Sequence, residues 1–216
     1  MPLFYQQNIN STTKLAVWHI TEPEEFFYEK AILHRNIVHP HKRLQHLAGR
    51  YLLKFLYPDF PNDEMMIADT RKPYLPNEQF HFSISHCGDY AAAIVSIDRR
   101  VGIDIEIKTD RVEKIKHKFL HEEELKAVEN SNASDFSLLT LLWTAKEAMY
   151  KWWGFGEVDF SEVLRLKVPE MQAEGKLFGK FEKEGIEIPL ELQYKEWETV
   201  VLCFLNTEKD AFKMID

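Results

Sequence analysis

The chain has 216 residues, of which 45% are hydrophobic and 13% aromatic, enough to bury one good core or two small joined cores. Its 27 Lys and Arg against 35 Asp and Glu give a net charge of -8, which disfavours nucleic acid as a partner, because nucleic-acid binders usually carry a basic face. Two cysteines without a paired Cys or His spacing argue against a disulfide framework and a zinc site. We find no apolar run of the ~18 to 20 residues that a membrane span needs and no signal-peptide pattern, so we expect a cytoplasmic protein that contacts no membrane.

Hydrophobic periodicity divides the first half of the chain into strands and helices. Apolar residues recur at helical spacing after Pro40, and apolar runs on either side of Cys87-Gly88-Asp89 predict a hairpin. The expected elements are a strand at 14–20, helices at 26–37 and 41–56, a short strand at 65–68, and hairpin strands at 80–86 and 90–97. We expect a small antiparallel sheet packed on a long helix.

The second half repeats this composition of elements. A strand is predicted at 101–107 and a long helix at 136–153. Gly154 and Gly156 are expected to end this helix. Four further alternating segments at 163–168, 176–181, 186–194 and 200–205 predict a meander. Each half thus shows a long amphipathic helix and several alternating strands.

The segment VGIDIEI at 101–107 alternates apolar and acidic residues with a period of two. In a strand, Gly102, Asp104 and Glu106 share one face, and the two carboxylates lie roughly 7 Å apart. Like charges at that distance favour a hard cation such as Mg2+ between them, and a bare glycine beside them would leave it room. The alternative is a half-exposed strand whose acids face water.

The helix at 136–153 carries a second group of polar residues in the segment WTAKEAMYK. Trp143, Glu147 and Lys151 follow one another at four-residue spacing, and Lys146 lies beside them. This spacing places an aromatic ring, an acid and bases on one helix face. An ordinary surface helix with an ion pair between Glu147 and Lys151 has the same pattern, so spacing alone leaves both interpretations open.

The two segments together resemble the paired signature of the 4'-phosphopantetheinyl transferases, (V/I)GxD(I/V)E followed by (W/F)xxKE(A/S)xxK. RKPYL at 71–75 resembles the GKPxL element of that family, and FSISHC at 82–87 resembles its FNxSHS element. Three positions depart from the pattern: Arg71 replaces a glycine, Ser83 an asparagine and Cys87 a serine. The chain length favours the larger, monomeric class that activates surfactin synthetase and related enzymes.

The resemblance implies a fold and a reaction. The fold would be a pseudo-dimer of two α+β halves, residues 1–100 and 101–216, with coenzyme A in the cleft between them. The reaction would transfer the 4'-phosphopantetheine of coenzyme A to a serine of an apo acyl or peptidyl carrier protein, with Mg2+ or Mn2+ bound, and release adenosine 3',5'-bisphosphate.

The resemblance also implies roles for individual residues. Asp104, Glu106 and Glu147 would bind the metal, and Lys151 would steady the transferring or leaving phosphate. Glu124 would accept the proton of the serine. The expected contacts to coenzyme A come from Arg43, Lys72, Ser85, His86 and Lys146.

The sequence also suggests a surface for a partner protein and two alternative functions. Carrier proteins of this kind are usually acidic, so the basic segment 108–118 is a candidate docking surface. A Mg2+-dependent phosphodiesterase could also use clustered carboxylates and a lysine. A catalytically inactive module that binds coenzyme A or a carrier protein is the alternative from another functional class.

Overall fold

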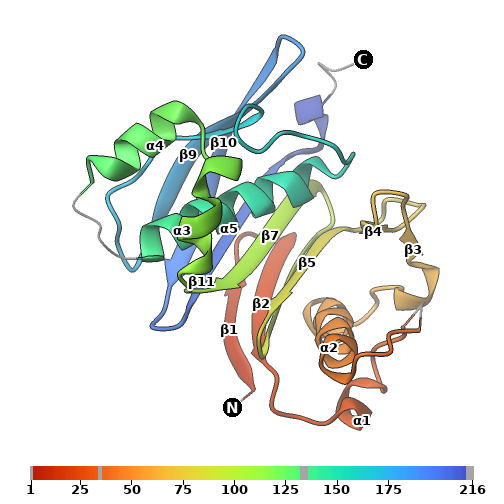
Figure 1. The fold of residues 1–216 in the computed structure, drawn as a ribbon. Helices are drawn as coiled ribbons and strands as arrows, with labels where there is room; N and C mark the ends of the chain where they lie inside the picture. Colours follow the sequence, from red (N-terminus) through yellow and green to blue (C-terminus); the bar gives the residue numbers. More distant parts are fainter. Residues whose placement is uncertain (1, 34–35, 132–135, 213–216) are drawn as a thin grey trace.

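The computed structural model describes residues 2–33, 36–131 and 136–212 and contains two antiparallel sheets, each packed against a long helix (Figure 1). The first sheet has the strand order β1-β2-β6-β5. It is formed by β1 (Leu3–Asn8), β2 (Thr13–His19), β6 (Tyr90–Ser96) and β5 (His81–Cys87), and α2 (Pro40–Leu56) packs against it. A small hairpin of β3 (Met66–Ile67) and β4 (Pro73–Tyr74) lies between α2 and β5 in the chain.

The second sheet has the order β7-β11-β10-β9-β8. Its strands are β7 (Arg99–Ile107), β11 (Val200–Glu208), β10 (Ile186–Glu196), β9 (Glu174–Lys183) and β8 (Leu164–Leu166), and its long helix is α5 (Phe136–Trp153). Shorter helices complete the described chain: α1 (Glu24–Phe27), α3 (Arg111–Ile115), α4 (Glu122–Glu129) and 3-10 turns at Asn62–Glu64, Lys116–Lys118 and Lys209–Phe212.

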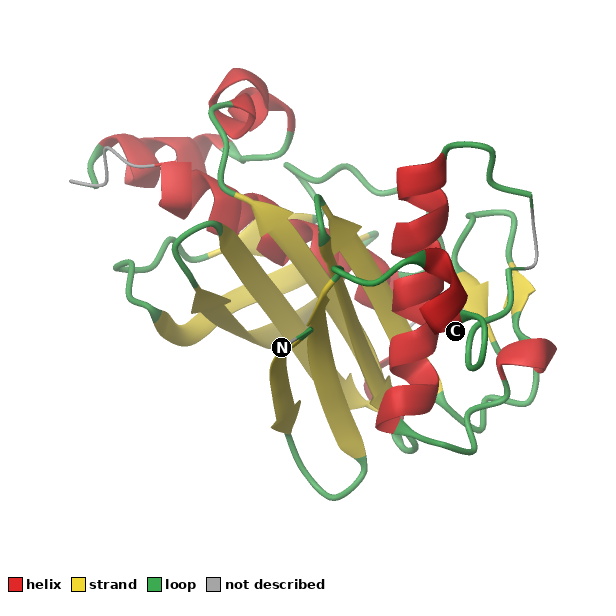
Figure 2. Ribbon diagram, turned by 90° about the horizontal axis from the view of Figure 1, so that it is seen from below, coloured by secondary structure: helices red, strands yellow, loops and turns green. Residues whose placement is uncertain are grey.

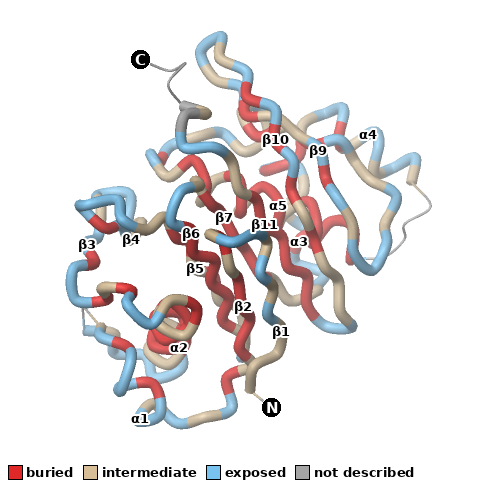
Figure 3. Tube along the Cα trace, turned by 180° about the vertical axis from the view of Figure 1, so that it is seen from behind, coloured by how far each residue is buried: buried red, intermediate tan, exposed pale blue. Residues whose placement is uncertain are grey.

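The elements stack in four layers, with the strands of both sheets in the middle and helices on either side (Figure 2). Alternation along each strand explains this order. On β2, Ala16 and Trp18 belong to the core beneath α2, whereas Leu15 and Val17 belong to a core shared with the second sheet. The inner strands are therefore buried on both faces, as the burial colouring in Figure 3 shows.

The two sheets approach most closely where β5 runs beside β7. The Ser83 hydroxyl accepts a hydrogen bond from the Ile103 N–H at 3.2 Å, and the Ser85 hydroxyl accepts one from the Ile105 N–H at 3.3 Å. These bonds satisfy buried backbone donors at the edge of β7 that has no neighbouring strand in its own sheet, because the other edge of β7 pairs with β11. The two serines thus fix β5 of the first half against β7 of the second.

Most predicted elements are confirmed, and the α+β class is confirmed with them. The predicted helix at 26–37 is wrong: α1 ends at Phe27, and positions 34 and 35 lie outside the described residues. Ile32 and Val38 are exposed, so a helix here would bury too little apolar surface to be stable. The strand β1 was not predicted. The pseudo-dimer and the boundary at residue 100 stay predictions. Among the described residues, none of the helices is both long and apolar enough to cross a membrane.

Candidate active site

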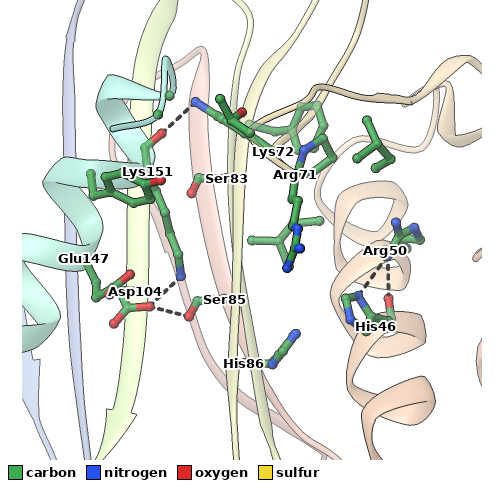
Figure 4. A pocket seen from close by; sticks show the side chains of 18 of the residues that line it. His46, Arg50, Arg71, Lys72, Ser83, Ser85, His86, Asp104, Glu147 and Lys151 are labelled. Carbon is green, nitrogen blue, oxygen red and sulfur yellow. Dashed lines mark hydrogen bonds and ion pairs between the residues drawn. The ribbon is translucent and has the colours of Figure 1, made fainter. Parts of the chain in front are cut away.

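A pocket with a cavity volume of about 420 Å³ opens between α2, β5, β7 and α5 (Figure 4). Its polar lining comes from five parts of the fold. These are His46 and Arg50 on α2, Arg71 and Lys72 in the β3–β4 hairpin, Ser83, Ser85 and His86 on β5, Asp104 and Glu106 on β7, and Glu147 and Lys151 on α5. The pocket therefore brings together the motifs that the sequence separates by up to about 80 positions.

Close packing of α5 on β7 forms the acidic side of the pocket. A Cβ added to Gly102 would lie 2.2 Å from the carbonyl oxygen of Ala148 and 2.8 Å from Cβ of Trp152. Gly102 is thus required for the helix to approach the strand, and not to leave room for a cation as we expected. The alternative of a water-facing acidic strand is also wrong at Asp104, which is only 2% exposed.

The two carboxylate oxygens of Asp104 differ: Oδ1 has two hydrogen-bond donors, and Oδ2 has none. Its Oδ1 accepts hydrogen bonds from the Ser85 hydroxyl at 2.5 Å and from Lys151 Nζ at 2.6 Å (Figure 4). Its Oδ2 is buried and has no hydrogen-bond partner. Because a buried, unpaired carboxylate oxygen is costly, this atom identifies a position where a positively charged ligand would be favoured.

Glu106 and Glu147 line the same side of the pocket as Asp104. Burial, reinforced by the charge of Asp104, raises the pKa of each of the two glutamates to about 7. Glu106 also accepts a hydrogen bond from Trp143 Nε1 at 3.1 Å. Full ionisation of the three carboxylates around Lys151 would leave an excess of negative charge, which is why the two glutamates resist losing their protons.

This excess charge and the oxygen-only ligands fit a hard divalent cation. However, the described residues contain no group of three or more His, Cys, Asp or Glu side chains close enough to hold a metal ion as they stand. At Asp104 Oδ1, the ammonium group of Lys151 supplies the positive charge instead. The donor set therefore suits a metal, although its side chains are not arranged as a finished site.

The opposite side of the pocket is basic. His46 and Arg50 lie one turn apart on α2, and the His46 ring meets the His86 ring edge-to-face at 4.9 Å between centroids. Lys72 lies elsewhere, at the end of α5: its Nζ donates to the carbonyl oxygen of Lys151 at 2.6 Å (Figure 4), and burial lowers the pKa of Lys72 to about 8. The sequence analysis missed His46 and Arg50; their four-residue spacing on one helix face was the available signal.

Arg43 is not brought to the pocket. Both oxygens of Glu24 accept hydrogen bonds from Arg43 Nε, at 3.0 and 2.9 Å, and the terminal nitrogen of Arg43 lies 2.7 Å from the same carboxylate. This bidentate pair fastens α1 to α2. Arg43 therefore lies outside the pocket, and the contact with coenzyme A that we expected of it stays a prediction.

Lys146 and Glu124 are also placed away from the pocket, in the core between α4 and α5. Lys146 is 0% exposed, and its Nζ donates to Glu124 Oε2 at 2.6 Å and to the carbonyl oxygens of Phe119 and Phe160. The same glutamate accepts from the backbone N–H of Leu166 at 2.6 Å. All these polar atoms have partners within the protein, which favours a structural role for both residues; the expected roles of Lys146 in binding and of Glu124 as a base stay predictions.

The comparisons with known proteins agree with the motifs. The family model described as the 4'-phosphopantetheinyl transferase superfamily matches residues 100–204. A Haemophilus influenzae protein provisionally named a 4'-phosphopantetheinyl transferase is 30% identical over 153 residues, which are 68% of this chain and 63% of that protein. A 4'-phosphopantetheinyl transferase of Aneurinibacillus migulanus is 28% identical over 66% of this chain and 59% of its own.

A third relative, named L-aminoadipate-semialdehyde dehydrogenase-phosphopantetheinyl transferase, comes from Xenopus laevis and is 29% identical over 64% of this chain and 55% of its own. The matched region thus spans less than two thirds of the length of each of these relatives. The helix α5 and all of the acidic strand β7 except Arg99 lie within the residues that the family model matches.

Proposed function

Because the chain belongs, through residues 100–204, to the 4'-phosphopantetheinyl transferase superfamily, we propose that it transfers 4'-phosphopantetheine from coenzyme A to an apo carrier protein. The serine oxygen of the carrier forms a bond to the phosphorus that bears pantetheine. The bond from this phosphorus to the bridging oxygen of the diphosphate breaks, adenosine 3',5'-bisphosphate leaves, and the serine proton passes to a base. The proposal rests mainly on one observation: the buried Oδ2 of Asp104 has no hydrogen-bond partner. Asp104 lines the pocket together with Glu106 and Glu147, and the bases line its other side.

Asp104, Glu106 and Glu147 would hold Mg2+ in this proposal. When bound, the cation neutralises charge on the diphosphate and so assists departure of the bisphosphate. The unpaired Oδ2 of Asp104 and the raised pKa values of the two glutamates support this assignment. Mn2+ satisfies the same oxygen ligands.

The side chains of the protein perform the remaining work. Lys151 approaches Asp104 from the pocket and retains 25% side-chain exposure, so its ammonium group can turn to a phosphate of the donor. Among the described residues that line the pocket, the acids are Asp104, Glu106 and Glu147, so in this proposal the serine proton passes to an oxygen of one of these carboxylates that the cation leaves free, in place of Glu124. Lys72 and Arg50 provide positive charge for the other phosphates, and the His86 ring provides a hydrogen-bonding group beside them.

The carrier protein would present its serine at the mouth of this pocket. The basic segment 108–118, proposed as its docking surface, is less positive than its composition indicates. Lys108, Lys114 and Lys116 form ion pairs with Glu196, Asp110 and Glu113, at 2.8, 2.8 and 2.7 Å. These pairs must exchange for carrier acids, so we propose a docking that is weak and salt-sensitive. We also propose that the protein acts as a monomer.

The test is the formation of adenosine 3',5'-bisphosphate from coenzyme A, followed by chromatography, with and without an apo carrier protein. The proposal predicts a product that requires both the carrier and a divalent cation and that equals the carrier modified. Product in the absence of a carrier would identify a phosphodiesterase instead. Binding of coenzyme A without any product, on fatty-acid, polyketide and peptidyl carriers alike, would identify an inactive binding module.

A further inference from the structure

Arg71 occupies a backbone position that normally requires glycine. Its φ is 65°, in the left-handed region, within the turn that joins β3 to β4. The turn is closed by hydrogen bonds from the Arg71 N–H to the carbonyl oxygen of Ala68 at 2.8 Å and from the Ala68 N–H to that of Lys72 at 3.0 Å. Hairpin loops of this kind favour glycine at the left-handed residue, because a side chain there is strained. An arginine at this position therefore costs stability.

The side chain of Arg71 is directed into the active-site pocket. Figure 4 shows it extending from the hairpin into the space between the carboxylates of β7 and α5 and the bases of α2. No hydrogen bond or ion pair joins its guanidinium group to any other described residue. By contrast, Arg43 is paired with Glu24, and Arg165 with Glu123. Arg71 is thus a strained residue that presents an unpaired guanidinium group to the pocket, as expected of a residue that contacts a ligand.

The neighbours of Arg71 indicate what it binds. His46, Arg50 and His86 lie on the side of the pocket away from the carboxylates. A group of bases without an acid among them suits a phosphate monoester, which carries nearly two negative charges, and the planar guanidinium group binds such a phosphate through two hydrogen bonds. Coenzyme A has two anionic parts, the diphosphate and the 3'-phosphate of the ribose. The carboxylates, a cation and Lys151 account for the diphosphate, which leaves the 3'-phosphate for the basic side.

We propose that Arg71 is a specificity-determining residue that binds the 3'-phosphate of coenzyme A. The inference rests on the proposed function, because it takes coenzyme A as the donor. It accounts for the departure of RKPYL from the GKPxL pattern: arginine replaces the glycine that the left-handed backbone favours, and its guanidinium group lines the pocket. The protein therefore discriminates coenzyme A from 3'-dephospho-coenzyme A through a residue that glycine could not replace.

The experiment compares the full chain with the variants Arg71→Gly and Arg71→Asn, both of which tolerate a left-handed backbone. Calorimetric titrations in Mg2+ buffer give the Kd for coenzyme A and for 3'-dephospho-coenzyme A. The matched control is Glu184→Gly, because Glu184 has a φ of 54° in the β9–β10 turn and does not line the pocket. Loss of a charge-assisted contact predicts that both Arg71 variants bind coenzyme A about tenfold or more weakly, with 3'-dephospho-coenzyme A changed less than about twofold.

A stability measurement separates a ligand contact from a structural role. Arg71→Gly removes the strained side chain, so thermal unfolding should occur at the same temperature as in the wild type or higher, while affinity for coenzyme A falls. The control Glu184→Gly should keep both affinities unchanged. An equal loss for the two ligands, or no loss, would overturn the inference, while transfer by the wild type would still support the proposed function. If the wild type neither binds coenzyme A nor transfers, the proposed function fails and the inference fails with it.

Discussion

Ser85 on β5 donates a 2.5 Å hydrogen bond to Asp104 on β7, so a residue of the first sheet orients a carboxylate of the second. The same hydroxyl accepts from the Ile105 N–H, which fixes its position on the adjoining strand. Asp104 Oδ1 is thereby directed to Ser85 and Lys151, and Oδ2 remains without a partner. The packing of the two sheets and the chemistry of the pocket are thus coupled at this pair.

The two serines of β5 should separate stability from activity. Ser83→Ala leaves the Ile103 N–H without an acceptor and should lower the free energy of unfolding by about 1 to 3 kcal/mol, with transfer activity largely retained. Ser85→Ala should lower stability to a similar extent and, in addition, reduce kcat, because Asp104 loses its positioning contact. Urea unfolding and transfer kinetics of the two variants measure this. Equal effects on kcat would show that Ser85 has no positioning role.

Asp104→Ala should abolish transfer, by about a thousandfold or more, while leaving the fold intact. The variant removes a buried oxygen that has no partner, and the released Lys151 side chain is partly exposed, so we expect a change in the free energy of unfolding within about 1 kcal/mol. The matched control is Asp110→Ala, which removes an exposed acid outside the pocket and should keep full activity. A folded Asp104→Ala protein with Mg2+-dependent activity would remove Asp104 from the proposed metal site.

Glu124 should prove to be a structural residue. Replacing it with Ala leaves the fully buried ammonium group of Lys146 unpaired, which typically costs about 3 to 5 kcal/mol of stability. Glu124→Gln keeps one acceptor oxygen for Lys146 and the His121 N–H, while the Leu166 N–H loses its acceptor. The variant should therefore be less stable than the wild type but retain substantial activity below its melting temperature, with an unchanged pH profile. A folded Glu124→Gln protein that binds coenzyme A but does not turn over would restore Glu124 as the base.

The stability of the metal-free protein should depend on pH through Glu106 and Glu147. In the folded protein the pKa of each glutamate is raised from 4.5 to about 7. Because the folded state then holds these protons more tightly than the unfolded state, they contribute fully to the free energy of unfolding below about pH 4.5, and this contribution is lost as pH rises through about 7. Each unit of pKa shift corresponds to about 1.4 kcal/mol. In EDTA, the melting temperature of the wild type should therefore fall between pH 5 and 7.5 relative to that of Glu147→Gln.

The comparison with Glu147→Gln is needed because two partly buried histidines act in the opposite direction. Burial lowers the pKa of His81 to about 4 and also lowers that of His86, so these residues favour folding as pH rises. The difference between the two proteins cancels their contribution. Parallel melting curves across this pH range would show that Glu147 titrates at its ordinary pKa.

The sequence predicted the elements whose pattern is local. The alternation at 101–107 and the glycine-terminated helix at 136–153 correspond to β7 and α5, and their motifs meet in the pocket, as Lys151 and Asp104 show. Long-range partners were not predictable in the same way. The pattern around Glu124 is the same whether the residue faces a substrate or a buried lysine 22 positions further on, and only the packing of α4 on α5 decides this.

The basic side of the pocket was missed for a related reason. His46 and Arg50 belong to a helix whose spacing shows that they share a face, but not that β5 and the β3–β4 hairpin lie opposite that face. Arg71 was noted only as a departure from a motif, because its backbone conformation and the direction of its side chain depend on the folded turn. Positions that break a local preference were therefore the most informative once the structure was known.

The most direct measurement is mass spectrometry of an apo carrier protein after incubation with this protein, coenzyme A and Mg2+, beside an EDTA control. Transfer of one phosphopantetheine arm predicts a gain of about 340 Da on the carrier, in Mg2+ only, and no gain with the Asp104→Ala protein. An unchanged mass for fatty-acid, polyketide and peptidyl carriers, with binding of coenzyme A demonstrated in the same samples, would contradict the account.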